Sequence, residues 1–103
     1  MATSIIKHDD TGWITLDSNV SYRKKNGVIF VKAYWASTTI NTAWAIKATL
    51  PSGYRPTGDI YFPAISTNTS QVLAYITSTG NIGLRTNTGT ASYAAFIISF
   101  PLS

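Results

Sequence analysis

The stretch Arg23-Lys24-Lys25-Asn26-Gly27-Val28-Ile29-Phe30-Val31 decides the fold class of this chain. Its centre, Asn26-Gly27, stands between two blocks that are rich in β-branched and aromatic residues. A two-residue type I′ turn needs positive φ at both central positions, and Asn followed by Gly tolerates this best. The stretch therefore predicts an antiparallel β-hairpin.

Six further blocks of similar composition flank this hairpin, and turn residues separate them. No window has the period of an amphipathic helix. The expected strands span residues 11–16, 20–25, 28–37, 43–50, 59–66, 71–78, 82–86 and 92–102. This spacing predicts an all-β fold of about eight antiparallel strands in a sandwich or jelly-roll-like barrel. We expect residues 1–10 to form a flexible N-terminal arm or stalk connection, and residues 11–103 a single β-sandwich domain.

Two of the expected strands are apolar on both faces. In the strand at 28–37, Ile29, Val31, Ala33 and Trp35 alternate with Val28, Phe30, Lys32 and Tyr34. In the last strand, Ala94, Phe96, Ile98, Phe100 and Leu102 alternate with Tyr93, Ala95, Ile97 and Ser99. Such strands are either covered on both sides within the chain or packed against another copy. Because only 12% of the residues are charged, against about 25% in an average domain, we favour a homo-oligomer.

Alternation also gives expectations for two other strands. In the strand at 43–50 it places Trp44, Ile46, Ala48 and Leu50 on one side. Pro63 has no N–H for a ladder hydrogen bond, so the strand at 59–66 is expected at a sheet edge or a bulge.

The composition excludes several classes of function. The 103 residues fit one domain, and the absence of cysteine excludes disulfides, thiolate zinc sites and a cysteine nucleophile. The net charge of +4 is spread along the chain, so we expect no nucleic-acid partner. No apolar run approaches the roughly 20 residues that span a bilayer, so we expect no membrane partner. The N-terminus has no signal-peptide apolar core, which indicates synthesis in a cytoplasm.

Titratable residues give no predicted catalytic, metal or cofactor site. His8, the only histidine, stands beside Asp9 and Asp10 near the end of the chain, where a solvated tail is the favoured interpretation. Asp17 has the place of a turn residue, and Asp59 is expected to pair with Arg55 or to cap the adjacent loop. These two acids leave a glycoside hydrolase open as an alternative.

Ligand-binding candidates come from aromatic and loop residues. Aromatic rings stack on sugar rings, and loops carry function more often than strands do. Core packing is the favoured interpretation for most tryptophans. The candidates are Tyr54 and Arg55 in the Pro/Gly-rich loop, Trp44 and Tyr93 as stacking faces, and Asn68 and Asn87 in polar loops.

Several stretches together resemble a known kind of domain. They are Gly12–Leu16, Val20–Val31, the specific run Leu50-Pro51-Ser52-Gly53-Tyr54-Arg55-Pro56, Ile60–Ala64, the Ile76–Ile82 hairpin and Phe100-Pro101-Leu102. In order and spacing the chain resembles the C-terminal head or receptor-binding domains of tail-fibre and baseplate proteins from phages and prophages of Gram-positive bacteria.

This resemblance implies a homotrimeric β-sandwich or jelly-roll-like head at the tail tip or baseplate of a virion. Its implied partners are a host cell-wall polysaccharide or other glycan, and other tail or baseplate proteins. Pro51, Gly53, Arg55 and Pro56 are expected to be architectural, and no binding residue is transferred by motif. Two alternatives stay open: a structural virion domain without a ligand, and a small polysaccharide-degrading enzyme.

Overall fold

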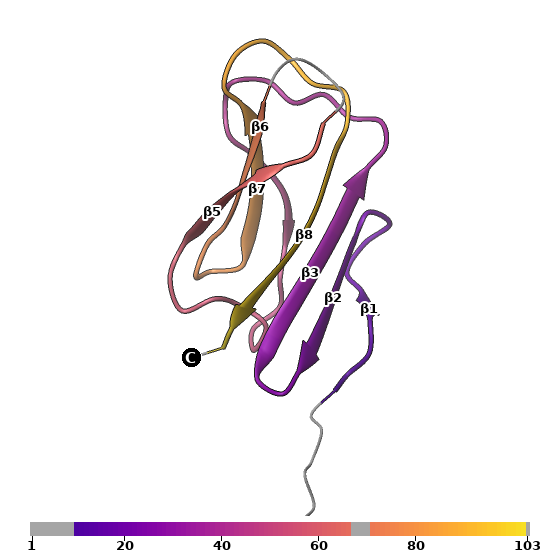
Figure 1. Cartoon of the computed structure of the whole chain (residues 1–103), viewed down its shortest axis with the longest axis vertical. Coiled ribbons are helices and arrows are strands. Elements are labelled where there is room, and N and C mark those ends of the chain that lie inside the picture. The colour runs from indigo at the N-terminus through magenta and orange to yellow at the C-terminus, as the bar shows by residue number, and fades with distance from the viewer. Residues whose placement is uncertain (1–9, 67–70, 103) are drawn as a thin grey trace, which may run out of the picture.

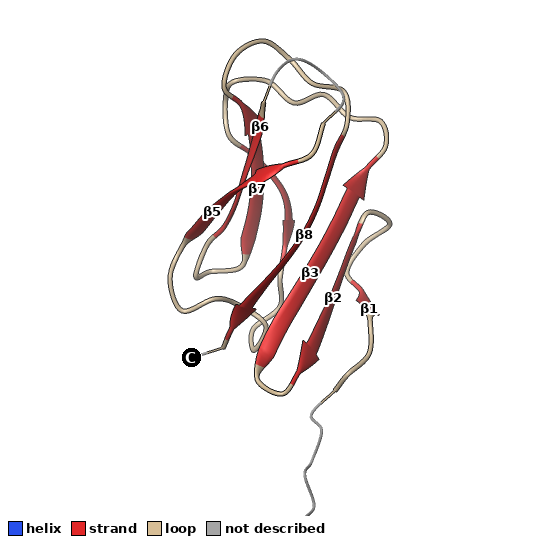
Figure 2. Cartoon of the chain, viewed as in Figure 1, coloured by secondary structure: helices blue, strands red, loops and turns tan. Residues whose placement is uncertain are grey.

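The computed structural model describes residues 10–66 and 71–102, which form two antiparallel four-stranded sheets (Figures 1 and 2). The strands are β1 (Ile14–Thr15), β2 (Val20–Lys25), β3 (Val28–Trp35), β4 (Ala45–Thr49), β5 (Ile60–Ala64), β6 (Val72–Ile76), β7 (Asn81–Thr86) and β8 (Ala94–Pro101). One sheet has the order β1-β2-β3-β8 and the other β4-β7-β6-β5. The expected all-β sandwich is confirmed, and the two sheets do not close into a barrel.

The hairpin that decided the fold class is present. Asn26 has φ 53° and Gly27 has φ 79°, the positive pair that a type I′ turn requires. This turn sets Lys25 opposite Val28, and the register continues to the pair Val20 and Ala33. The long β3 then pairs with β8 on its other side, from Val28–Pro101 to Trp35–Ala94.

The core lies between the sheets and is built from alternate residues of each strand. On β3, Ile29 and Val31 are fully buried, while Lys32 and Tyr34 further along the strand are exposed. Each strand therefore has one inner and one outer face, as its two-residue period requires. The second sheet contributes the fully buried side chains Val72, Ala74, Ile76, Ile82 and Leu84, together with the buried hydroxyl of Thr86.

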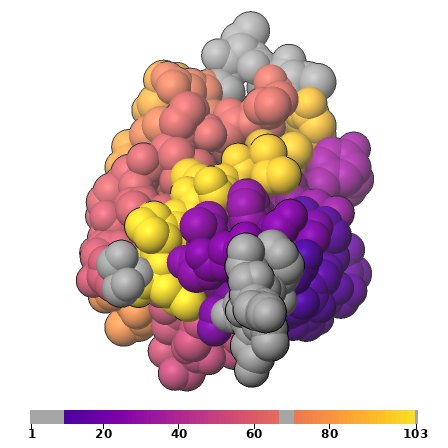
Figure 3. Space-filling view, turned by 60° about the horizontal axis from the view of Figure 1, so that its bottom comes forward, coloured from indigo at the N-terminus to yellow at the C-terminus, as the bar shows by residue number. Residues whose placement is uncertain are grey.

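Hydrogen bonds join the two sheets along one side of the sandwich. The N–H of Ile65, just after β5, donates to the carbonyl of Ala95 on β8 at 2.8 Å, and the N–H of Ala95 donates back at 3.0 Å. In Figure 3 the yellow C-terminal segment lies between the purple β2–β3 hairpin and the salmon segment that contains β5. The outer faces of β5 and β8 are therefore neighbours on the surface.

The second sheet has a Greek-key order, because β4 lies beside β7 and not beside β5. The connection from β4 to β5 is the Pro/Gly-rich loop, and Arg55 fixes its start. Its Nε donates to the carbonyl of Leu50 at 2.8 Å, while the N–H of Leu50 donates to the carbonyl of Gly80 at 2.8 Å. The loop is thereby attached to the β6–β7 turn, which supports an architectural role for Arg55.

Two expectations need correction: one concerns the faces of the strand at 43–50, and the other concerns a side-chain pairing. The strand at 43–50 does not present one continuous face, because a β-bulge between Ile46 and Ala48 shifts the register. Trp44 and Ile46 are 38% and 57% exposed, whereas Leu50 is fully buried. The pairing of Arg55 with Asp59 is also wrong: Arg55 bonds to Leu50, and Oδ1 of Asp59 accepts the N–H of Ser78 at 2.9 Å.

The strands β5 and β8 both lie at sheet edges. Pro63 lies on β5, which is the edge strand of its sheet, as expected. The doubly apolar β8 is also an edge strand of its sheet and is not covered on both sides within the chain, because Ile97 is 70% exposed. Its outer face is therefore free to contact another molecule.

Gly80 provides a test of the connection between the loop and the turn. Its φ is +92°, and an added Cβ would lie 2.5 Å from the carbonyl oxygen of Leu50 and 2.6 Å from Nε of Arg55. We expect Gly80→Ala to lower the free energy of unfolding by roughly 1–3 kcal/mol, measured by urea denaturation. The control is Gly58→Ala, where no atom lies within 4 Å of the added Cβ. Equal midpoints for the two variants would contradict the assigned role of Gly80.

Candidate functional site

The outer face of the second sheet carries an aromatic cluster that crosses its strands. The ladder sets Ile46 of β4 opposite Gly83 of β7, Gly83 opposite Tyr75 of β6, and Tyr75 opposite Tyr61 of β5. These four positions form one row across the sheet, and the side chains of Ile46, Tyr75 and Tyr61 point away from the core. We call Trp44, Tyr61, Tyr75 and Arg85 the aromatic face.

The three rings of the aromatic face are in mutual contact. The ring centroids of Trp44 and Tyr75 are 4.5 Å apart, those of Tyr61 and Tyr75 are 5.9 Å apart, and those of Trp44 and Tyr61 are 6.1 Å apart. Tyr61 is 67% exposed and Trp44 38%. Since each ring supports its neighbours, the cluster presents a preformed apolar surface to solvent.

Gly83 makes this arrangement possible. A Cβ added at Gly83 would lie 2.3 Å from Cζ and 2.6 Å from Cε1 of Tyr75. The ring of Tyr75 therefore lies directly over the backbone of β7, in the space that any other residue would fill. From this position it reaches Trp44 on the far side of β7.

The β-bulge in β4 supplies the other half of the cluster. Ala45 pairs with Leu84 and Ala48 pairs with Ile82, so Lys47 is the additional residue between the two registers. Because of this residue, Trp44 and Ile46 face outward while Ala48 and Leu50 face the core. Without the shift, these four residues would share a face.

Arg85 is the charged member of the aromatic face. It follows Leu84, the partner of Ala45, so it lies opposite Trp44, and its guanidinium carbon is 5.4 Å from the centroid of the Trp44 ring. Its Nε also donates to the carbonyl of Thr86 at 3.3 Å. A guanidinium at the edge of an aromatic surface combines stacking with directional hydrogen bonding.

Of the residues predicted as binding candidates, only Trp44 lies in the aromatic face. Tyr54 packs against the buried Tyr22 with ring centroids 4.7 Å apart, and Arg55 bonds to Leu50. Tyr93 contacts Tyr34 on the outer face of the first sheet at 5.9 Å. The structure thus distributes these candidates over separate surfaces.

Of the two asparagine candidates, the structure describes Asn87, which lies just after β7. The Oδ1 of Asn87 accepts the N–H of Gln71 at 3.2 Å, and its N–H donates to the carbonyl of Gln71 at 3.0 Å, so Asn87 ties β6 to the end of β7. Asn68 lies outside the described residues, as does His8. No binding role for either asparagine follows from these contacts.

Sequence reasoning missed Tyr61, Tyr75, Gly83 and Arg85. Alternation places Tyr61 on the other face of its strand from Phe62, and Tyr75 on the other face from Ala74 and Ile76. This alternation is the sequence signal that identifies the two tyrosines as outward-facing. It does not reveal that β5, β6 and β7 are neighbours in the right register. The cluster depends on that register.

A second exposed tryptophan on the first sheet has a different environment. Trp13 is 40% exposed, but Nζ of Lys32 lies 4.2 Å from its ring centroid. A shallow open hollow beside it is lined by Trp13, Arg23, Lys25 and Phe30. The Lys32 ammonium lies over the Trp13 ring, and within residues 10–66 and 71–102 no second aromatic ring contacts Trp13, whereas Trp44 contacts both Tyr61 and Tyr75. We therefore prefer the aromatic face as the candidate site.

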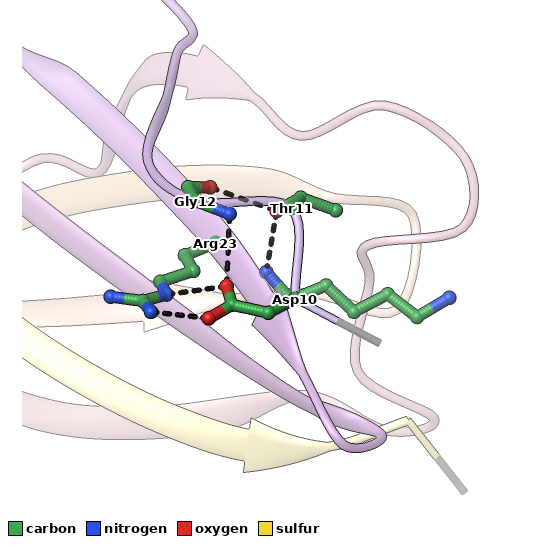
Figure 4. Close-up of polar contacts among 5 residues, drawn as sticks. Asp10, Thr11, Gly12 and Arg23 are labelled. Carbon is green, nitrogen blue, oxygen red and sulfur yellow. Dashed lines mark hydrogen bonds and ion pairs between the residues drawn. The ribbon is translucent and has the colours of Figure 1, made fainter. Parts of the chain in front are cut away.

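Asp10 joins the start of the described chain to β2 (Figure 4). Its carboxylate accepts two hydrogen bonds from Arg23, of which the Nε bond is 2.8 Å, and a third from the N–H of Gly12 at 2.9 Å. The hydrogen bond from Arg23, followed by that from Gly12, lowers the pKa of Asp10 from 3.8 to about 2. Asp10 was expected in the arm at residues 1–10, and the rest of that arm lies outside the described residues.

Asp17 has the structural contacts of a turn residue. Oδ1 of Asp17 accepts the N–H groups of Asn19 and Val20 at 2.7 and 2.9 Å, which confirms its predicted turn chemistry. Within residues 10–66 and 71–102, no three His, Cys, Asp or Glu side chains are grouped as metal ligands would be.

The same part of the chain contains no helix long and apolar enough to cross a membrane. No family model matches the chain, and no curated protein matches it.

The pair of Asp10 with Arg23 makes a prediction about pH. Because the pKa of Asp10 lies below the ordinary 3.8, the stabilisation from the pair is present above about pH 3.8 and is lost as the pH falls through about 2. Carboxyl-carbon NMR should show Asp10 titrating near pH 2, and Arg23→Gln should move its midpoint up toward the ordinary value. A wild-type midpoint near 3.8 would show that the pair does not persist in solution.

Proposed function

We propose that this chain is a host-recognition module of a phage or prophage that binds a cell-surface carbohydrate through the aromatic face. The observation that carries the proposal is the contact of Trp44, Tyr61 and Tyr75 on one exposed sheet surface. Three large side chains held outward do not contribute to the core of this chain, so their placement calls for a ligand. The rings are inclined to one another by 48° to 76°, so a sugar can stack its C–H groups on the exposed face of one ring while the other rings border it.

The resemblance of the sequence to tail-fibre and baseplate head domains supports the biological setting. We propose that the chain works by binding and not by catalysis, at the tail tip or baseplate of a virion and in contact with other tail proteins. The Leu50–Pro56 motif is the most specific part of that resemblance. Its role in holding the β4–β5 connection agrees with an architectural motif that stays fixed while binding surfaces vary.

A second exposed surface favours assembly into the proposed homotrimer. Ile65 is 68% exposed and Ile97 is 70% exposed, and the Ile65–Ala95 pairing brings their strands together. Tyr34, 54% exposed, pairs with Ala95 on the same outer face. We call Ile65 and Ile97 the aliphatic surface. Branched aliphatic side chains lack a flat face for a sugar but pack well against another protein.

The two surfaces are compatible with one another in a multivalent head. Association through the aliphatic surface leaves the aromatic face of each copy available. Three weak sites held rigidly together bind a polymeric glycan far more strongly than one. A purely structural virion domain is the second candidate, and it uses the aliphatic surface alone.

Replacing Trp44 tests the proposed binding. A glycan array of bacterial cell-wall polysaccharides would first identify a bound saccharide, and calorimetric titration would then compare Trp44→Ala with the wild type. We expect Trp44→Ala to weaken binding by about 0.5–1.5 kcal/mol per site, the scale of one aromatic contact. The matched control is Trp13→Ala, since Trp13 is equally exposed but lies on the other sheet. Absence of any array binding at millimolar saccharide, or equal losses in the two variants, would contradict the proposal.

Replacing Ile97 tests the proposed assembly. Sedimentation equilibrium at micromolar protein should give a trimer for the wild type and a monomer for Ile97→Lys, because a buried unpaired charge opposes association. Thr57→Lys places the same charge on an exposed loop and should leave the trimer intact. A wild-type monomer would remove the assembly proposal, and an Ile97→Lys trimer would move the interface elsewhere.

A further inference from the structure

The charges of the second sheet indicate which kind of saccharide the aromatic face would select. The strands β4, β5, β6 and β7 contain no Asp or Glu and two cations, Lys47 and Arg85. Nζ of Lys47 donates to the Thr38 hydroxyl at 3.1 Å. Arg85 is the cation that lies within the aromatic face, beside the Trp44 ring.

The guanidinium of Arg85 keeps donors for a ligand. Its Nε bonds to the carbonyl of Thr86, while its two terminal nitrogens carry four further N–H groups. The guanidinium lies over the Trp44 ring, with its carbon 5.4 Å from the ring centroid, so a ligand on the ring cluster is within reach of its N–H groups.

Resting on the proposed carbohydrate-binding function, we propose that Arg85 makes the aromatic face selective for negatively charged saccharides. The sugar ring contacts the exposed part of the ring cluster, and Arg85 binds a carboxylate or phosphodiester oxygen of the same or the next unit. Arginine suits both groups, since its planar fork matches two oxygens at once. The absence of carboxylates on the four strands leaves nothing on them to repel such a ligand.

The alternative role for Arg85 is purely structural, as a support for the Trp44 ring. The two roles differ in one measurable respect. A support affects neutral and charged ligands alike, whereas an anion-binding group affects only charged ones. Paired ligands that differ in charge alone therefore separate the two roles.

The experiment is calorimetric titration with two matched pairs of probes. One pair is an oligosaccharide containing glucuronic acid and its carboxyl-reduced neutral form. The other is a phosphodiester-linked oligosaccharide and its free neutral repeating unit. We expect the wild type to bind at least one charged probe about tenfold or more tightly than its neutral partner, as a charge-assisted hydrogen bond implies. The pair that shows the preference identifies the anionic group.

Variants of Arg85 test whether this residue causes the preference for charged probes. Arg85→Gln should lose the preference, so that it binds the charged and the neutral probe of each pair with equal affinity. Arg85→Lys keeps the charge without the planar fork and should retain part of the preference; it also serves if the Gln variant does not fold. Lys25→Gln removes one positive charge from the first sheet and should behave as the wild type.

The outcomes separate this proposal from the one on which it rests. Equal wild-type binding of charged and neutral probes overturns the role of Arg85 and leaves the aromatic face as a neutral-sugar site. An equal loss in Lys25→Gln and Arg85→Gln overturns it as well, because it reveals attraction to the whole positive chain. A loss of neutral-probe binding in Arg85→Gln assigns Arg85 the supporting role instead. Binding of none of the four probes, with no bound saccharide on the array, overturns the proposed function itself.

Discussion

The two-residue period of the strands, and its interruption at Lys47, determine what this molecule presents to its surroundings. Every strand sends alternate side chains into the core, so the residues between them face outward whatever their chemistry. On β4 the additional residue changes that assignment within the strand. Trp44 and Ile46 would otherwise share a side with Leu50, which is fully buried. The aromatic face exists because β4 contains one residue more than the facing segment of β7.

The outer surface contains two kinds of apolar group with different physical uses. Trp44, Tyr61 and Tyr75 are flat, polarised rings next to a guanidinium. Ile65 and Ile97 are branched, have no polar atoms and lie where β5 meets β8. Rings with a cation suit a small polar ligand, and branched side chains suit a complementary protein surface. The sequence pattern of doubly apolar strands did not distinguish these two uses.

Much of the fold could be predicted because its determinants are local. Asn26-Gly27 fixes the central hairpin, alternation identifies the inner residues of β3 and β8, and Pro63 identifies an edge strand. All eight expected strands are present, with ends shorter by a few residues in most cases. The order of the strands was not predictable from such signals, since it depends on contacts between residues far apart in the chain.

The candidate site was largely missed for the same reason. Trp44, Tyr61, Tyr75 and Arg85 come from four strands, and only their register makes them neighbours. Tyr54 and Arg55 were predicted to bind a ligand because they lie in an unusual Pro/Gly-rich loop. The composition of this loop reflects the Greek-key connection, which the two residues hold in place. The most distinctive local motif has an architectural role, whereas the rings of the aromatic face lie in strands whose sequences have no distinctive motif.

Gly83 has a consequence for how such a surface can diversify. The side chains at positions 46, 61 and 85 project outward from the sheet, so substitutions there change the chemistry of the face without creating a cavity in the core. Position 83 has no such latitude, because Tyr75 rests on its bare backbone. The surrounding positions can therefore accept substitutions, whereas position 83 must remain glycine. Such an arrangement allows ligand specificity to change while the contact between Tyr75 and β7 is kept.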